Sequence, residues 1–279
     1  MQEALLKIAR RYPQLLLPIR AGMRQTEEYK NAVLGGEIPD TQPHFRCPEA
    51  FRAETADTPA GRAEILYFGD RQDFLQAYQA LAYRCEPTPI PDSVGAVTIG
   101  GLINWEKIHT HRDEYLGAGG GDWDAEFARF TAEKKNYRDS VILLSGGYYS
   151  NVPPEAAGLS EEEWKEKSYR IRKFHELTHF TCRGLYPEDI DALRDEVIAD
   201  SIGLMAAFGR CDRRLARLFL GVEDGVFREG GRLSHYAAAE ELGDAVRRVN
   251  ALIDEYAARI ERAREEGQDI FALLLRIFP

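Results

Sequence analysis

Hydrophobic and polar positions along the chain predict helices at both ends and strands between them. Residues 1–34 show helical spacing interrupted at Pro13 and Pro18, and a loop rich in Pro, Thr and Asp follows from Gly35 to about Gly61. Short apolar runs bounded by turn residues then indicate strands. The predicted central elements are strands over 63–68, 94–103 and 141–144 and a helix over 71–83.

The helix with the clearest signals begins after Ser160. A hydroxyl at Ser160 and a carboxylate at Glu163 have the spacing of a capping box. Near the other end, Arg183 suits the last turn, and Gly184 is expected to cap the helix in the left-handed conformation, with Pro187 beyond it. The spacing therefore predicts one long helix over about 160–184.

A second helix is expected from about Pro187 to Gly209. One side of this helix is apolar, and an adjoining stripe carries two carboxylates and a glycine. The stripe contains Glu196, Asp200 and Gly203 at helical spacing. The apolar positions are Ile190, Leu193, Val197, Leu204 and Phe208.

Apolar residues from Leu242 to Ala263 recur every four and three positions over about three heptads. Such a seam suits either packing against the rest of the chain or dimerisation, and we expect the first. Together these patterns predict an α+β fold, with a small mixed sheet packed on the long helix. The expected division is an N-terminal helical and loop segment over 1–60, a core over 61–210 and a C-terminal helical segment over 211–279.

Composition narrows the possible partners and surroundings. The 279 residues carry a formal charge of −10 without a run of basic residues, which argues against a nucleic-acid partner. The N-terminus intersperses charges with apolar residues, and no apolar stretch is long enough for a membrane helix. The four cysteines are widely spaced, without a C-x-x-C pair. We therefore expect a cytoplasmic protein with reduced thiols and no membrane partner.

Metal chemistry is indicated by the segment His175-Glu-Leu-Thr-His179. Residues four apart lie on one side of a helix, so both imidazoles can bind one zinc ion. Glu176 is rotated by about 100° from His175 and is expected to act as the general base. Two further histidines, in His109-Thr-His111, are expected in a polar loop.

A catalytic zinc needs a third protein ligand, and the stripe on the second helix offers one. We expect Glu196 to bind the zinc and Asp200 to accept the outer N–H of a ligand histidine. Gly203 would allow the two helix backbones to approach closely.

His175-Glu-Leu-Thr-His179 followed by Glu196-Val-Ile-Ala-Asp200 resembles the zincin metallopeptidases of the gluzincin group, which pair H-E-x-x-H with a downstream E-x-x-x-D helix. The resemblance covers roughly residues 170–205. It implies a zincin-like core, a peptide or protein substrate, and the same ligands and base. By the same analogy, Val141–Leu144 would be an edge strand along which an extended substrate pairs.

Gluzincins usually use a His or Tyr to stabilise the oxyanion, and four residues are candidates here: His235, Tyr148, Tyr149 and Tyr186. An alternative is a zincin-like protein without peptidase activity, with a structural zinc or a binding role. Lys173 favours it, because the stricter peptidase signature has uncharged residues just before the motif. In such a site Cys182 or another side chain would fill the fourth position of the zinc; otherwise Cys182 is a buried thiol.

Overall fold

The computed structural model describes residues 2–186, 191–265 and 267–278 and has the expected α+β character. The chain divides into two compact units. One comprises Met1–Thr55, Glu64–Ile90 and Thr98–Ser145; the other comprises Ala56–Ala63, Pro91–Val97 and Gly146–Pro279. No helix among the described residues is both long and apolar enough to cross a membrane.

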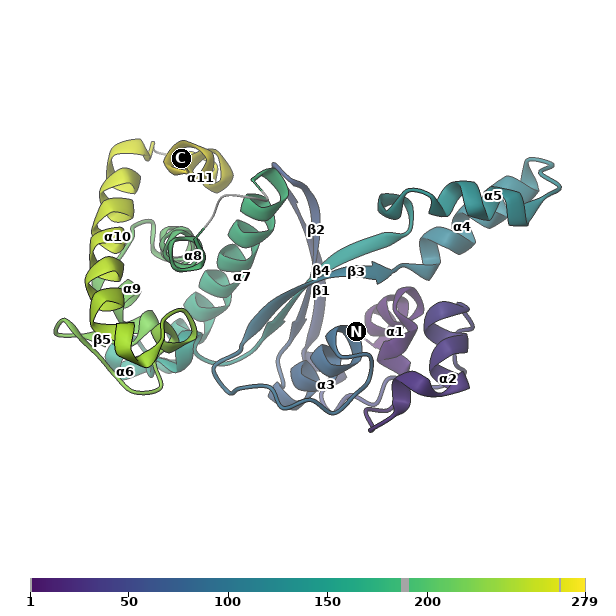
Figure 1. Cartoon of the computed structure of the whole chain (residues 1–279), viewed down its shortest axis with the longest axis horizontal. Coiled ribbons are helices and arrows are strands. Elements are labelled where there is room, and N and C mark those ends of the chain that lie inside the picture. The colour runs from purple at the N-terminus through teal and green to yellow at the C-terminus, as the bar shows by residue number, and fades with distance from the viewer. Residues whose placement is uncertain (1, 187–190, 266, 279) are drawn as a thin grey trace. The chain divides into compact units, whose positions relative to one another are not determined.

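A four-stranded sheet has the order β1-β2-β4-β3 (Figure 1). Its strands are β1 (Phe51–Thr58), β2 (Gly61–Phe68), β3 (Ala96–Ile103) and β4 (Arg138–Ser145). β2 and β4 are parallel, with Ile65 paired to Ile142. Only two residues connect β1 to β2, which requires these neighbours to be antiparallel. The sheet is therefore mixed, as expected.

The prediction that Val141–Leu144 forms an edge strand is wrong, because β4 lies between β2 and β3. All four of these residues are completely buried. A continuous apolar run is typical of a strand covered on both sides, whereas an exposed edge strand alternates. The edges are formed by β1 and β3.

The first unit contains three elements that were not predicted from the sequence: α4, α5 and β1. α4 and α5 lie side by side (Figure 1). β1 falls in the loop expected from Gly35 to about Gly61, α4 contains the His109-Thr-His111 segment expected in a polar loop, and no element was predicted over α5. His109 and His111 consequently lie on α4 and not in a loop; His111 Nε2 is 2.5 Å from Glu126 Oε1 on α5. The helices are α1 (Gln2–Arg11), α2 (Glu27–Tyr29), α3 (Arg71–Ala82), α4 (Trp105–Gly117) and α5 (Trp123–Thr131), with short helical turns η1 (Pro13–Leu16), η2 (Met23–Gln25), η3 (Lys30–Leu34), η4 (Pro48–Ala50) and η5 (Lys134–Asn136).

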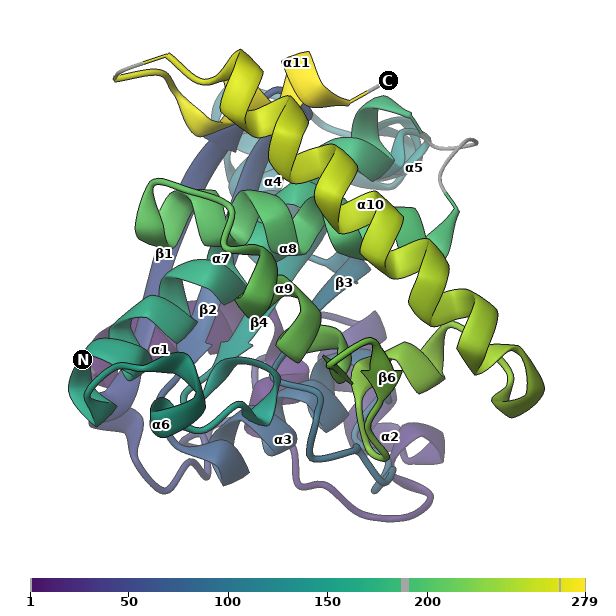
Figure 2. The same ribbon diagram turned by 90° about the vertical axis from the view of Figure 1, so that its left-hand side faces the viewer.

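The second unit is a group of helices around α8, which packs against α7, α9, α10 and α11. Figure 2 shows α10 crossing α8. Its helices are α6 (Pro154–Ala157), α7 (Glu161–Leu185), α8 (Ala192–Phe208), α9 (Arg213–Leu220), α10 (Leu242–Ala263) and α11 (Ile270–Ile277). Short turns and strands complete it: η6 (Tyr149–Asn151), β5 (Val222–Glu223), β6 (Val226–Phe227), η7 (Arg232–His235) and η8 (Ala239–Glu241).

The ends of α7 follow the sequence signals only in part. The capping box of Ser160 and Glu163 is present, so the predicted start is confirmed. Gly184 does not cap the helix, which continues to Leu185. A Cβ at Gly184 would lie 2.6 Å from the Cβ of Ala60, so the glycine is explained by a close contact and not by a left-handed turn.

α8 begins after Asp191, whose side chain accepts a hydrogen bond from the Arg194 N–H, and ends at a left-handed Gly209 as predicted. The expected start at Pro187 and the packing position Ile190 lie outside the described residues.

The apolar seam of α10 is covered within the chain. Val249, Ile253 and Tyr256 have no exposed surface, and the helix packs on α8, α9 and α11. The structure therefore agrees with the expectation that this seam packs against the rest of the chain.

α7 and α8 approach closely at Gly203, as predicted. A Cβ on this residue would lie 2.8 Å from the carbonyl oxygen of Ile171 and 3.0 Å from its Cγ2. Such contacts force one helix to move, so the small residue sets the distance between the two helices.

Replacing Gly203 with alanine is expected to lower the free energy of unfolding by up to about 2 kcal/mol. The overpacking cost of about 1–3 kcal/mol outweighs the ~1 kcal/mol that alanine gains over glycine in a helix. Urea unfolding measures the change. Gly243→Ala on α10 is the matched control, since no atom lies within 4 Å of a Cβ there; it is expected to be neutral or stabilising. Equal stability of the two variants would contradict the close-contact explanation.

Candidate metal centre

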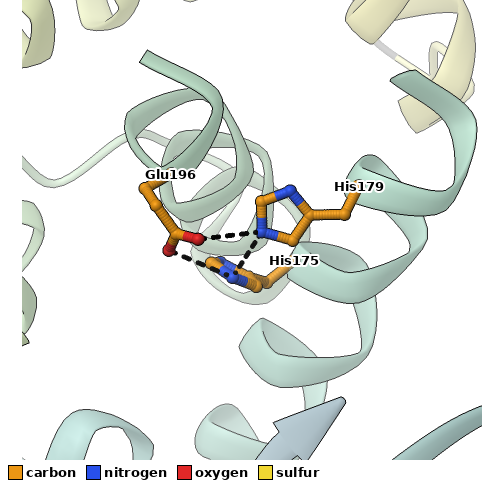
Figure 3. A group of neighbouring side chains, drawn as sticks. All are labelled: His175, His179 and Glu196. Carbon is orange, nitrogen blue, oxygen red and sulfur yellow. Dashed lines mark hydrogen bonds and ion pairs between the residues drawn. The ribbon is translucent and has the colours of Figure 1, made fainter. Parts of the chain in front are cut away.

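α7 and α8 bring together the three residues that were predicted from the sequence as metal ligands. His175 and His179 project from α7 toward Glu196 on α8 (Figure 3). Their Nε2 atoms are 3.0 Å apart, and the Glu196 oxygens lie 3.5 Å from His175 Nε2 and 3.3 Å from His179 Nε2. One ligand atom from each residue lies within 4.8 Å of the others. This spacing allows one ion to contact all three.

The outer nitrogen of His175 is held by two groups. Its Nδ1 lies 2.9 Å from Asp200 Oδ1, the contact expected from the sequence. It also lies 2.8 Å from the Tyr149 hydroxyl, which donates to the same Asp200 oxygen at 2.6 Å. Tyr149 was a candidate for oxyanion stabilisation, but its hydroxyl contacts the side of the ring away from Glu196.

His179 has a carboxylate of its own at Nδ1. Asp195 Oδ2 lies 2.8 Å from this nitrogen and 3.3 Å from Arg183 Nη2. Sequence reasoning missed Asp195, although its place directly before Glu196 on a helix was a usable signal. Each histidine therefore has a carboxylate at Nδ1, an arrangement that favours a proton on Nδ1 and leaves Nε2 able to bind a metal.

Electrostatics in the cluster favour a cation. Burial alone lowers the pKa of His179, but its contacts with Asp195 and Glu196 outweigh burial and raise it to about 10. Burial acts to raise the pKa of Glu196, yet His179, His175 and Arg232 together hold it well below its usual range. The carboxylate is therefore ionised, the state in which it binds metal.

Arg232 and Tyr236 reach the cluster from the loop after β6 and were missed by sequence reasoning. Arg232 Nη2 donates to Glu196 Oε2 at 2.7 Å, and its Nη1 donates to Ser150 Oγ at 2.8 Å. Burial, the largest cause, raises the pKa of Tyr236, and the charge of the neighbouring Glu196 raises it further. The residues around Arg232 and Tyr236 form no sequence pattern that would indicate a contact with α8, which lies more than thirty positions earlier in the chain.

Glu176 follows His175 directly and is 8% exposed. A buried carboxylate next to a ligand histidine is suited to proton transfer, since a low-dielectric setting strengthens its interactions.

The remaining candidates lie away from the three ligand atoms. Tyr186 is 40% exposed and stacks on Phe278, and His235 is exposed beside Tyr236. Tyr148 hydrogen-bonds to Glu161 at the start of α7. Cys182 is buried in the apolar core. Among the described residues, no histidine, cysteine or carboxylate joins the three as a fourth ligand.

Two imidazole nitrogens and one carboxylate form a donor set that suits zinc, with one coordination position left over. No curated protein and no solved structure matches the chain. One family model does match, over residues 2–273, and its description reads "Family of unknown function (DUF7005)". Since this match spans nearly the whole sequence, the chain belongs to that family.

Proposed function

We propose that this protein is a zinc-dependent hydrolase, most closely a metallopeptidase of the gluzincin type. The observation that carries the proposal is the convergence of His175, His179 and Glu196, with Asp200 and Asp195 at the outer histidine nitrogens. Zinc sites with three protein ligands and one open position are typically catalytic.

Bound zinc would lower the pKa of a water molecule to roughly 7 and polarise a substrate carbonyl. Glu176 takes the proton of the attacking water and delivers it to the nitrogen of the leaving amine, so that the C–N bond breaks and an acid and an amine result. Arg232 donates to Glu196, and Tyr236 lies beside the same carboxylate, so both are candidate donors for the negative charge that develops on the carbonyl oxygen. The proposed substrate is a peptide or protein.

The alternative of a structural zinc requires a fourth side chain. Cys182 was the residue suggested for that position, and its burial in the apolar core does not favour the role. Its sulfur is also not part of the group formed by His175, His179 and Glu196.

Metal analysis of the purified protein is expected to find one zinc per chain. Zinc at a hundred times its dissociation constant should stabilise the fold by about 2.7 kcal/mol, seen as a higher melting temperature than in chelator. A peptide library followed by mass spectrometry should show cleavage that chelator abolishes and zinc restores. Zinc binding without cleavage of any peptide would favour the binding role, and a chain that binds no zinc would contradict both functions.

A further inference from the structure

Tyr149 occupies an unusual position beside the cluster, at the start of a turn that follows the sheet. Its side chain is buried, with 4% of the residue exposed. The hydroxyl donates to Asp200 Oδ1 at 2.6 Å, and its oxygen lies 2.8 Å from His175 Nδ1. Because the single hydroxyl proton goes to Asp200, the oxygen can accept the proton of His175 Nδ1–H.

We propose that Tyr149 is a positioning residue of the zinc site, whose hydroxyl fixes the ring of His175 with Nε2 unprotonated and turned toward Glu196. The inference rests on the proposed zinc function. Asp200 and Tyr149 then both accept from the Nδ1–H of His175, whereas the sequence predicted only Asp200 as the acceptor.

The backbone around Tyr149 is held firmly. Its N–H donates to Ser168 Oγ on α7 at 2.9 Å, and the carbonyl oxygen of Tyr148 accepts from Arg172 Nη2 at 3.1 Å. Ser150 and Asn151 both have positive φ, 51° and 56°. Two successive residues in the left-handed region persist only where surrounding contacts fix them, and such strain is found at functional sites.

The ring of Tyr149 is equally constrained. Its centroid lies 4.7 Å from that of Phe219 in a T-shaped arrangement, and the guanidinium carbon of Arg232 lies 5.4 Å from the Tyr149 centroid. The same Arg232 donates to Glu196 at 2.7 Å and to the Tyr149 hydroxyl at 3.1 Å. One network thus connects a proposed histidine ligand on α7 with the proposed carboxylate ligand on α8, and Tyr149 and Asp200 are its members at His175 Nδ1.

Tyr149→Phe tests the proposal, because it removes the hydroxyl and keeps the ring. Titration against a chromogenic chelator should show a zinc dissociation constant about tenfold higher, at the lower end of the 10–100-fold usual for outer partners of a ligand histidine. In the cobalt-substituted protein the visible absorption bands should shift, since the orientation of His175 changes. Loss of packing alone would not move these bands.

Tyr256→Phe is the matched control in the same unit. Tyr256 is also fully buried, and its hydroxyl accepts from Arg194 Nε at 2.6 Å. Zinc affinity and the cobalt spectrum should be unchanged in this variant, and the melting temperature of the metal-free proteins shows that each variant is folded.

Zinc affinity equal to that of the unaltered chain in Tyr149→Phe would overturn the inference and leave the zinc function intact. Equal weakening in both tyrosine variants would also overturn it, as a general effect of losing a buried hydroxyl. An unaltered chain that binds no zinc would overturn the inference together with the proposed function. If the unaltered chain binds zinc but hydrolyses no peptide, a tenfold loss of zinc affinity in Tyr149→Phe would still support the positioning role.

Discussion

Glu176→Gln is expected to keep zinc bound while the rate of peptide hydrolysis falls by about 10²- to 10⁴-fold, the usual contribution of a positioned general base. Glutamine has the shape of glutamate but cannot accept a proton from water at neutral pH. Since His175, His179 and Glu196 are untouched, the metal content should stay the same. Steady-state kinetics with a cleaved peptide, together with metal analysis of the same sample, measure both quantities.

Glu166→Gln provides the control, because it makes the same change on the exposed side of α7. Its kinetics and zinc content should equal those of the unaltered protein. Full hydrolysis by Glu176→Gln with zinc in place would contradict the role of base. A loss confined to KM, with kcat unchanged, would instead assign Glu176 to substrate binding.

The parts of the site that sequence reasoning reached are those carried by helical periodicity. His175 and His179 share a side of α7 because they are four residues apart, and the polar stripe of α8 placed Glu196 and Asp200 together. Gly203 on that stripe then predicted the close approach of the two helices, which the contact with Ile171 confirms.

The missed parts depend on contacts between distant segments. Arg232 and Tyr236 lie in a loop whose own pattern says nothing about α8, and only the folded chain places them at Glu196. Gly184 shows the same limit. Its sequence context suggested a helix cap, but the contact that explains it is with Ala60, more than a hundred residues earlier.

Errors in the sheet have a different cause. β1 is an edge strand on which polar residues dominate and only Phe51 is fully buried, so it lacks the apolar run that marked the other strands. The pattern of apolar residues along the chain does not give the order of strands in the sheet, so it could not place β4 between β2 and β3. Edge and interior strands can be distinguished by how continuous their apolar residues are, and Val141–Leu144 carried this signal.

Glu196→Gln is expected to weaken zinc binding by more than about a hundredfold, which exceeds the loss usual for outer partners of a ligand. A neutral amide oxygen is a poor donor to zinc compared with a carboxylate. The amide oxygen can still accept from Arg232 but no longer carries the charge that His179, His175 and Arg232 stabilise, so the metal-free variant should lose some stability, though less than a variant without any acceptor. Chelator competition measures the affinity, and urea unfolding in chelator measures the stability.

Glu196→Ala separates the two roles of this residue. It should lose zinc to the same degree and in addition lower the metal-free stability by about 1–3 kcal/mol, because Arg232 loses its contact at 2.7 Å while its side chain is only 12% exposed. Glu223→Gln, at an exposed pair with Arg228, should change neither quantity. Unchanged zinc affinity in Glu196→Gln would remove Glu196 from the ligand set. Loss of zinc in both Glu196 variants, with the larger loss of stability in Glu196→Ala, requires a side chain that both binds the metal and accepts from Arg232.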